Sequence, residues 1–245
     1  MDKTKRLYVY VYIYASPEEM SRVAAETFVE TCEKRVKAKG LFTVILSGGK
    51  TPERLYRLLG TDFKDKIPWE KVHLFWGDER CVGPESRESN YKMAYDSLIS
   101  KVSIPERNIH RIKGEIEPSV SAKAYEDEIR GFFNIPASAF PVFDLVLLGL
   151  GNDGHTLSLF PASKALFESE RLIIDNYVDK LSAFRITATL PVINNASMGI
   201  FLVSGKEKAG ILREVLKGTE AIYPAQMARP GKLLWFVDKD AASEL

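Results

Sequence analysis

Apolar residues along the chain gather in short runs that end at glycines or at charged residues. Three runs are strong and four are weaker: LFTVILSGG, KVHLFWGDER and FDLVLLGLG, then RLIID, SAFRITATL, MGIFLVSG and LLWFVD. Runs that are apolar throughout, rather than alternating with polar residues, are typical of strands buried on both faces. The pattern therefore predicts several strands inside a parallel sheet.

Helical patterns lie between these runs. Ser16, Pro17 and Glu19 are the residue types expected at the N-cap, first and third positions of a helix that ends near Gly40. Further helical segments occur at 52–60, 89–100, 119–132 and 206–217, and surface loops are expected at 103–118 and 134–142. The βαβα order predicts one doubly wound α/β domain over 1–245, with a mostly parallel sheet and helices on both faces.

The first sixteen residues, MDKTKRLYVYVYIYAS, join charges to an apolar stretch, as a signal peptide does. Their alternating Leu, Tyr and Val and the lack of a small-residue cleavage site favour a first strand instead. No run approaches the roughly 20 apolar residues of a membrane span. The two cysteines, Cys32 and Cys81, are far apart and form no disulfide framework. We therefore expect a soluble protein of the cytoplasm.

Charge is nearly balanced along the chain. The 34 Lys and Arg against 33 Asp and Glu leave a net charge of +1, so no bulk field would hold nucleic acid or a membrane surface. Any anion site must be local. His73 and His110 are expected to be structural, and no HExxH or similar pair is present to hold a metal. We expect a site without metal or cofactor.

Polar residues follow the predicted strands, where ligands gather in open parallel sheets. In SGGKTP, Gly48 and Gly49 let the backbone approach a ligand, and Thr51 and Pro52 have the types of a helix N-cap and first position. Exposed N–H groups at such a helix start attract phosphate. A tight turn without a ligand would use the same residues, so this segment alone leaves both interpretations open.

The segment GLGNDGHTLSLFP carries the strongest signal. Asp153 and His155 flank a glycine at a strand end, which places an imidazole and a carboxylate together in a cleft, and imidazole can take a proton from water. The same segment matches GxGxxG, with Asp175 about twenty residues further on, as a dinucleotide site would require. Pro161 leaves little room for the helix of such a site, so we favour the acid–base interpretation.

Other charged residues lie near strand ends. Asp78, Glu79 and Arg80 in GDER could form a surface ion pair, and Arg185 and Lys206 could be merely solvated. Together, however, Arg80, Arg185 and Lys206 beside the glycine turn would suit a phosphorylated substrate, because guanidinium and ammonium groups both hold phosphate. No GxSxG or SxxK motif indicates a covalent acyl-enzyme, and Cys81 is expected to be a packing residue.

Five segments together resemble the 6-phosphogluconolactonase family in content and order: LSGGKTPERLY, FWGDERCVGPESRESNYKMAYDSL, FDLVLLGLGNDGHTLSLFP, RITATLPVINNA and FLVSGKEKAGIL. The resemblance runs from about residue 8 to residue 238. It implies the Rossmann-like α/β fold shared with glucosamine-6-phosphate deaminases and ribose-5-phosphate isomerases. Asn152 and Leu157 depart from it, because many members have Pro and Ala there.

The resemblance also implies a function. The expected substrate is the sugar-phosphate lactone 6-phosphoglucono-1,5-lactone, opened by a water that His155 deprotonates while Asp153 supports the imidazolium. Gly48, Gly49, Thr51, Asp78, Arg80, Arg185 and Lys206 match positions around the substrate. A monomer or weak homo-oligomer is expected. Two alternatives remain. One is a glucosamine-6-phosphate deaminase, and the presence of SLFP in place of the deaminase-like FNEP argues against it. The other is a catalytically silent sugar-phosphate sensor.

Overall fold

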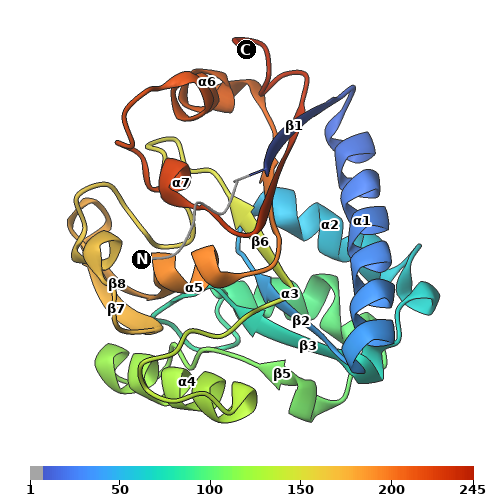
Figure 1. Cartoon of the computed structure of the whole chain (residues 1–245), viewed down its shortest axis with the longest axis vertical. Coiled ribbons are helices and arrows are strands. Elements are labelled where there is room, and N and C mark those ends of the chain that lie inside the picture. Colours follow the sequence, from blue (N-terminus) through green and yellow to red (C-terminus); the bar gives the residue numbers. More distant parts are fainter. Residues whose placement is uncertain (1–7) are drawn as a thin grey trace.

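The computed structural model describes residues 8–245 and is built around a seven-stranded sheet (Figure 1). All neighbouring strands in this sheet are parallel, as predicted. Their order across the sheet is β1 (Tyr8–Tyr14), β10 (Lys232–Asp238), β9 (Gly199–Val203), β6 (Leu145–Gly149), β2 (Phe42–Leu46), β3 (Val72–Trp76) and β5 (Ile109–His110). The predicted first strand is confirmed as β1, and residues 1–7 of the predicted segment lie outside the described residues.

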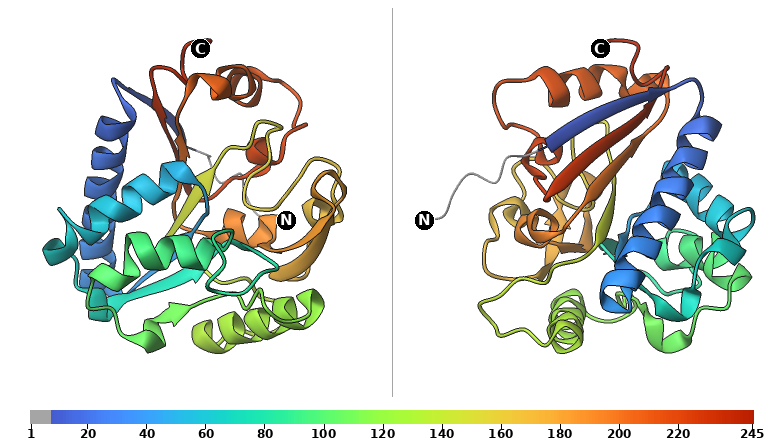
Figure 2. Two further views of the ribbon diagram at one scale, coloured as in Figure 1. Left: turned by 180° about the vertical axis from the view of Figure 1, so that it is seen from behind. Right: turned by 45° about the vertical axis from the view of Figure 1, so that its right-hand side comes forward.

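Helices cover both faces of this sheet, as predicted for a doubly wound α/β fold. Helices α1 (Pro17–Lys39) and α2 (Lys50–Gly60) lie on one face, with α3 (Asn90–Ser97) beside α2 (Figure 2). The other face carries α4 (Pro118–Phe133), α5 (Leu190–Asn195), α6 (Ala209–Lys217) and α7 (Pro224–Met227). Within residues 8–245, no helix combines the length and the apolar character needed to cross a bilayer.

The core lies between the sheet and these helices. Every residue of β2 and of β9 is buried, which is why both strands are predominantly apolar in the sequence. Aromatic side chains fill the space on either side: the rings of Phe28 and Phe42 meet edge to face at 5.2 Å, and Phe201 stacks on Trp235 at 3.8 Å.

Two helix starts test the predictions from capping residues. The hydroxyl of Ser16 accepts a hydrogen bond from the Glu19 amide (3.2 Å), and Gly40 ends α1 with a left-handed φ of 83°, as predicted. The prediction for α2 was wrong. Its N-cap is Gly49, with φ of 109°, so Thr51 lies inside the helix rather than capping it.

A second, antiparallel sheet of three strands was not predicted. It contains β4 (Asp78–Arg80), β8 (Ala183–Ala188) and β7 (Ile173–Val178), in that order. The runs RLIID and SAFRITATL therefore form antiparallel strands outside the large sheet, which corrects the expectation that they belong to it. Both strands are only partly buried, unlike strands covered on two faces.

Gly77 joins the two sheets. Its N–H donates to the carbonyl of Leu46 in the large sheet (2.9 Å), and its carbonyl accepts from the amide of Ala188 in the small one (2.7 Å). A Cβ at this position would come within 2.7 Å of the Leu157 side chain. A side chain at residue 77 would therefore have to displace the Leu157 side chain from the junction between the sheets.

One predicted loop contains a strand. His110, expected in the loop 103–118, lies in β5 at the sheet edge, where its ring stacks on Phe75 at 4.1 Å. Its Nε2 is 3.1 Å from Nδ1 of His73, and its Nδ1 is 2.7 Å from Glu128. Burial lowers the pKa of His73 to about 4. Both imidazoles thus have hydrogen-bond partners within the fold.

Candidate active site

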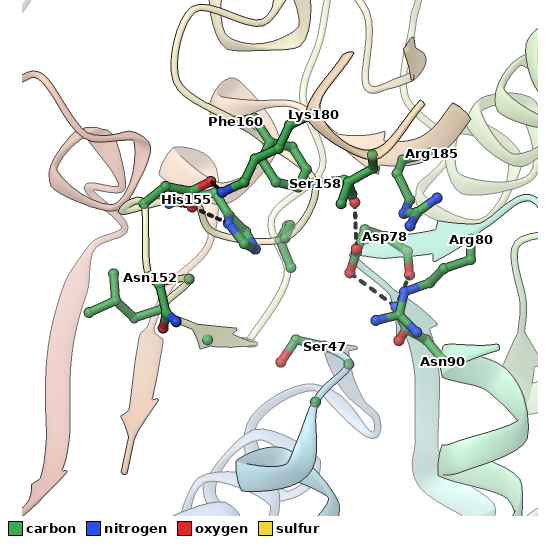
Figure 3. A pocket seen from close by; sticks show the side chains of 18 of the residues that line it. Ser47, Asp78, Arg80, Asn90, Asn152, His155, Ser158, Phe160, Lys180 and Arg185 are labelled. Carbon is green, nitrogen blue, oxygen red and sulfur yellow. Dashed lines mark hydrogen bonds and ion pairs between the residues drawn. The ribbon is translucent and has the colours of Figure 1, made fainter. Parts of the chain in front are cut away.

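A cleft of about 550 Å³ lies where the carboxyl ends of β2 and β6 meet the small sheet (Figure 3). Seven of the predicted residues line it: Gly48, Gly49, Asp78, Arg80, Asp153, His155 and Arg185. Thr51 instead lines a smaller adjoining hollow, which shares Gly48 and Gly49 with the cleft. Lys206 lines neither of these hollows, whereas Lys208 lines both.

His155 and Asp153 form a hydrogen-bonded pair on one wall of the cleft. The two side chains meet at 2.5 Å between Nδ1 of His155 and Oδ1 of Asp153, and the imidazole also packs on the Phe160 ring at 4.3 Å. Lys180 donates to the second carboxylate oxygen of Asp153 at 3.1 Å. Partial burial raises the pKa of Asp153, but the bonds from His155 and Lys180 outweigh it and hold this pKa at about 2. Asp153 is therefore an anion beside the imidazole.

Glycines create the space for this pair. A Cβ on Gly151 would lie 2.0 Å from Nδ1 of His155, so the imidazole occupies the place of a side chain at residue 151. The N–H of Gly151 donates to the carbonyl of His155 (2.8 Å), which closes the turn. Gly154 has a φ of 77°, a conformation that favours glycine.

The dinucleotide alternative does not fit this segment. After Gly149, the chain continues through turns to a short 3-10 helix at Lys164–Phe167. A dinucleotide site of that type needs a helix that begins directly after the glycines, because its N-terminus receives the pyrophosphate. Asp175 lies inside β7 and pairs with Ile186 in the small sheet.

The opposite wall is built around Asp78, which is only 6% exposed. Its carboxylate accepts hydrogen bonds from the hydroxyl of Ser158 (2.7 Å) and the amide of Asn90 (3.3 Å). A Cβ on Gly48 would lie 1.9 Å from Oδ1 of Asn90, so this close approach also requires glycine. Ser158 and Asn90 fall inside segments that the sequence singled out, but sequence alone gave no reason to select them.

Glu79 points away from the cleft and is buried. Its carboxylate accepts from the amides of Arg80, Asn90 and Tyr91 at 2.7–2.8 Å and from the Ser89 hydroxyl at 2.9 Å. Burial raises its pKa despite these bonds. The ion-pair interpretation of GDER is wrong for Glu79, which instead ties β4 to the start of α3.

Arg80 and Arg185 are neighbours on adjacent strands of the small sheet. They are directly paired residues of the antiparallel strands β4 and β8, so Arg185 lies within a strand rather than at its end. One guanidinium donates to the carbonyl of Glu88 and the other to that of Phe184. Within residues 8–245, neither forms an ion pair with a carboxylate. Two guanidiniums side by side, each bonded only to a neutral carbonyl, are suited to a dianion.

The floor of the cleft offers two further polar groups. Ser47 is 4% exposed, and within the described residues its hydroxyl has no hydrogen-bond partner, whereas its backbone N–H and carbonyl both bond to Tyr56. Lys208 donates to Oδ1 of Asn152 at 2.5 Å, and burial lowers its pKa. Lys180 and Lys208 were both missed from the sequence. No sequence pattern around Lys180 indicated a role in the site. The 3-10 turn Lys206–Lys208 leaves Lys206 exposed and turns Lys208 toward the cleft.

The two departures from the family pattern both border the cleft. Asn152 holds Lys208 as described, and an Asn can do so where a Pro could not. Leu157 has a left-handed φ of 50° and packs over Gly77. Its bulk therefore fills the junction between the sheets as well as bordering the cleft.

Comparison with known proteins identifies the chain's relatives. Residues 15–235 match the model of the family described as glucosamine-6-phosphate isomerases/6-phosphogluconolactonase. A 6-phosphogluconolactonase of Synechocystis is 42% identical, covering 86% of this chain and 88% of its own. One from Nostoc is 40% identical, covering 94% and 96%. The crystal structure of 6-phosphogluconolactonase from Thermotoga maritima superposes with a TM-score of 0.82 at 30% identity, covering 94% and 100%. The chain belongs to the glucosamine-6-phosphate isomerase/6-phosphogluconolactonase family.

Proposed function

We propose that the protein hydrolyses 6-phosphoglucono-1,5-lactone to 6-phosphogluconate, the second step of the oxidative pentose phosphate pathway. The observation that carries this proposal is the position of the His155–Asp153 pair in the same cleft as Arg80 and Arg185. A general base and a phosphate-binding pair in one cavity suit a phosphorylated substrate that reacts with water. The names of the Synechocystis, Nostoc and Thermotoga relatives support the same activity.

His155 acts as the general base. Because Nδ1 faces the Asp153 carboxylate, it carries the proton in the neutral ring, which leaves the Nε2 lone pair for a water molecule. Nε2 takes a proton from that water as its oxygen bonds to C1 of the lactone. The resulting imidazolium is stabilised by ionised Asp153. The tetrahedral intermediate collapses by breaking the bond from C1 to the ring oxygen, which receives the proton from His155.

Arg80 and Arg185 hold the phosphate. The lactone carbonyl is at C1 and the phosphate is on C6, so the two ends of the substrate need binding groups on different parts of the cleft. Figure 3 shows His155 and the two arginines on opposite walls. The backbone at Gly48 and Gly49 and the Ser47 hydroxyl line the floor between them and can bond the sugar hydroxyls. Lys208 lies at the His155 end and can stabilise the oxyanion.

A cytoplasmic location is part of the same proposal. Cys32 and Cys81 are both unpaired thiols, which suits a reducing compartment. The substrate itself is a metabolite with a short lifetime in water, since lactones of this kind open spontaneously. An enzyme that accelerates its opening would therefore act where the lactone is made.

The proposal is tested by generating 6-phosphoglucono-1,5-lactone in situ and following its loss with and without the protein, in the presence of a chelator. Acceleration well above the spontaneous rate is expected. Glucosamine 6-phosphate serves as a parallel substrate, because the family description also covers its isomerases. Ammonia release from it would assign the chain to the deaminases instead, and no reaction with either compound would support a sugar-phosphate sensor.

A further inference from the structure

The turn that carries Asp153 and His155 is attached to two lysines from different parts of the fold. Lys180, in the short 3-10 turn between β7 and β8, donates to Asp153 at 3.1 Å. Lys208, directly before α6, donates to the side-chain oxygen of Asn152 at 2.5 Å. Both lysines line the cleft. Two consecutive residues of one turn therefore each hold an ammonium group.

The two ammonium groups differ in what their acceptors do to their charge. Lys180 forms an ion pair with the ionised carboxylate of Asp153. The acceptor of Lys208 is a neutral amide, and in the part of the chain that the structure describes this lysine has no other hydrogen-bond partner and no ion pair. An amide oxygen fixes the position of an ammonium group without cancelling its charge. Lys208 is therefore the lysine of this pair whose charge is available to an anion in the cleft.

The backbones on both sides of the Asn152–Lys208 bond are held in place. The N–H of Ala225 donates to the carbonyl of Gly154 at 3.1 Å, which fixes the turn, and the N–H of Lys208 donates to the carbonyl of Gly205 at 3.0 Å. Only the long, flexible side chain of the lysine remains to be positioned. Because Lys208 lines both the cleft and the adjoining hollow, its bond to Asn152 decides on which side the ammonium group lies.

The position of Asn152 places this charge near the reacting carbonyl. Figure 3 shows Asn152 on the same wall as His155, with Arg80 and Arg185 on the other wall. In the proposed hydrolysis, His155 activates the water that attacks C1, so the carbonyl oxygen of C1 lies at this wall. A charge that is already in place where an oxyanion develops stabilises it without the cost of reorganisation.

We propose that Asn152 is a positioning residue, which holds the ammonium group of Lys208 at the His155 wall, where its charge stabilises the oxyanion formed at C1. The inference rests on the proposed lactone hydrolysis and adds a residue to it. Asn152 acts through Lys208 and does not contact the reacting atoms. Burial lowers the pKa of Lys208, and the nearby carboxylates of Glu207 and Asp153 oppose this shift.

The first test is a double-mutant cycle on lactone hydrolysis. Asn152→Ala should lower kcat by about tenfold, the range for a lost hydrogen bond to a charged group, and Lys208→Met should lower it at least as much. In the Lys208→Met chain, Asn152→Ala should then change kcat by less than about twofold. A residue that only shapes the turn would instead lower kcat by the same factor in both chains, and that result would overturn the proposal.

A matched control removes the acceptor of a different lysine. Lys123 on α4 donates to Asp127 at 2.5 Å, and neither residue lines the cleft, so Asp127→Ala should leave kcat unaltered. Asn152 is exposed and its φ is not positive, so alanine fits its backbone. Thermal unfolding checks this, and Asn152→Ser, whose side chain is too short to reach the lysine, replaces Asn152→Ala in the cycle if the alanine variant does not fold.

The second test compares two substrates. The carbonyl at C1 is common to 6-phosphoglucono-1,5-lactone and to glucono-1,5-lactone, which has no phosphate. Asn152→Ala should therefore lower kcat/KM by the same factor for both lactones. A loss confined to the phosphorylated lactone would place Lys208 at the phosphate and would overturn the assignment to the oxyanion.

The third test observes the ammonium group without turnover. In protein labelled with ¹⁵N-lysine, an ammonium group held in a hydrogen bond exchanges slowly with water and gives its own resonance, which Lys208→Met identifies by its loss. Asn152→Ala should abolish this resonance, whereas Asn152→Asp keeps an oxygen acceptor and should retain it. A resonance that Asn152→Ala leaves unchanged would overturn the proposal. If the unaltered chain does not hydrolyse the lactone, the proposed function fails, and this resonance still tests the bond between Asn152 and Lys208.

Discussion

The two sheets contribute to the cleft in different ways. The parallel sheet supplies turns at the ends of β2 and β6, and one of these turns holds both His155 and Asp153 within three residues. The antiparallel sheet supplies Arg80 and Arg185, which are about a hundred residues apart in the chain and meet through strand register. The pair proposed as the general base thus depends on local backbone geometry, whereas the arginine pair proposed to hold phosphate depends on a long-range contact.

The largest expected effect separates the chemical step from binding. His155→Asn should lower kcat by about 10² to 10⁴, because it removes the base while keeping a side chain that can bond Asp153. Steady-state hydrolysis of the lactone measures this loss. Binding of 6-phosphogluconate should change little, since the arginine wall is untouched. A variant that keeps kcat within about threefold of the original would remove His155 from the mechanism.

A smaller effect is expected on the arginine wall. Arg185→Ala should lower kcat/KM for the phosphorylated lactone by about 10- to 100-fold, the range for a lost hydrogen-bonded charge. Glucono-1,5-lactone without phosphate should be affected far less. Lys206→Ala is the matched control, because Lys206 is exposed and outside the cleft lining, and it should leave both rates unaltered. Equal losses on the two lactones would place the phosphate elsewhere.

The smallest expected effect is on the free energy of unfolding, through the locally formed pair of Asp153 and His155. The pKa of Asp153 is lowered from 3.8 to about 2 in the folded protein, so the unfolded chain binds more protons in this interval. The stabilisation is therefore complete above about pH 4 and is lost as pH falls toward 2. Asp153→Asn should lower the unfolding free energy by about 0.5–1 kcal/mol at pH 6, and this difference should shrink below pH 4. Denaturant titrations at several pH values measure it, and a difference independent of pH would contradict the assigned ionisation.

The parallel sheet could be predicted because its signals are local. Each buried strand is a predominantly apolar run, and α1 carries Ser16 and Gly40 at its ends as cap residues require. The small sheet could not be predicted in the same way. Strand β4 has only three residues, all of them charged, and nothing in GDER indicates that it pairs with residues 185–187. Apolar content alone does not distinguish these strands from those of the large sheet.

The same division applies to the site. The proximity of Asp153 and His155 followed from their spacing around Gly154, and it was found in the structure. Lys208 was missed in favour of Lys206 because a 3-10 turn, rather than a regular helix, decides which lysine turns to the cleft. Lys180 reaches Asp153 from another segment through an ion pair, and sequence periodicity does not report such contacts.

The alternation of side chains along β4 restricts how this part of the molecule can change its length. Asp78 and Arg80 border the cleft, while Glu79 between them holds the start of α3. Inserting or deleting a single residue in this strand would exchange the two faces, so that Glu79 would enter the cleft and the arginine would be buried against α3. A substitution in β4 would alter the contacts of one residue, but a change of length would displace Asp78, Glu79 and Arg80 together. Differences in length between relatives should therefore fall in the segment 83–88, beyond the strand.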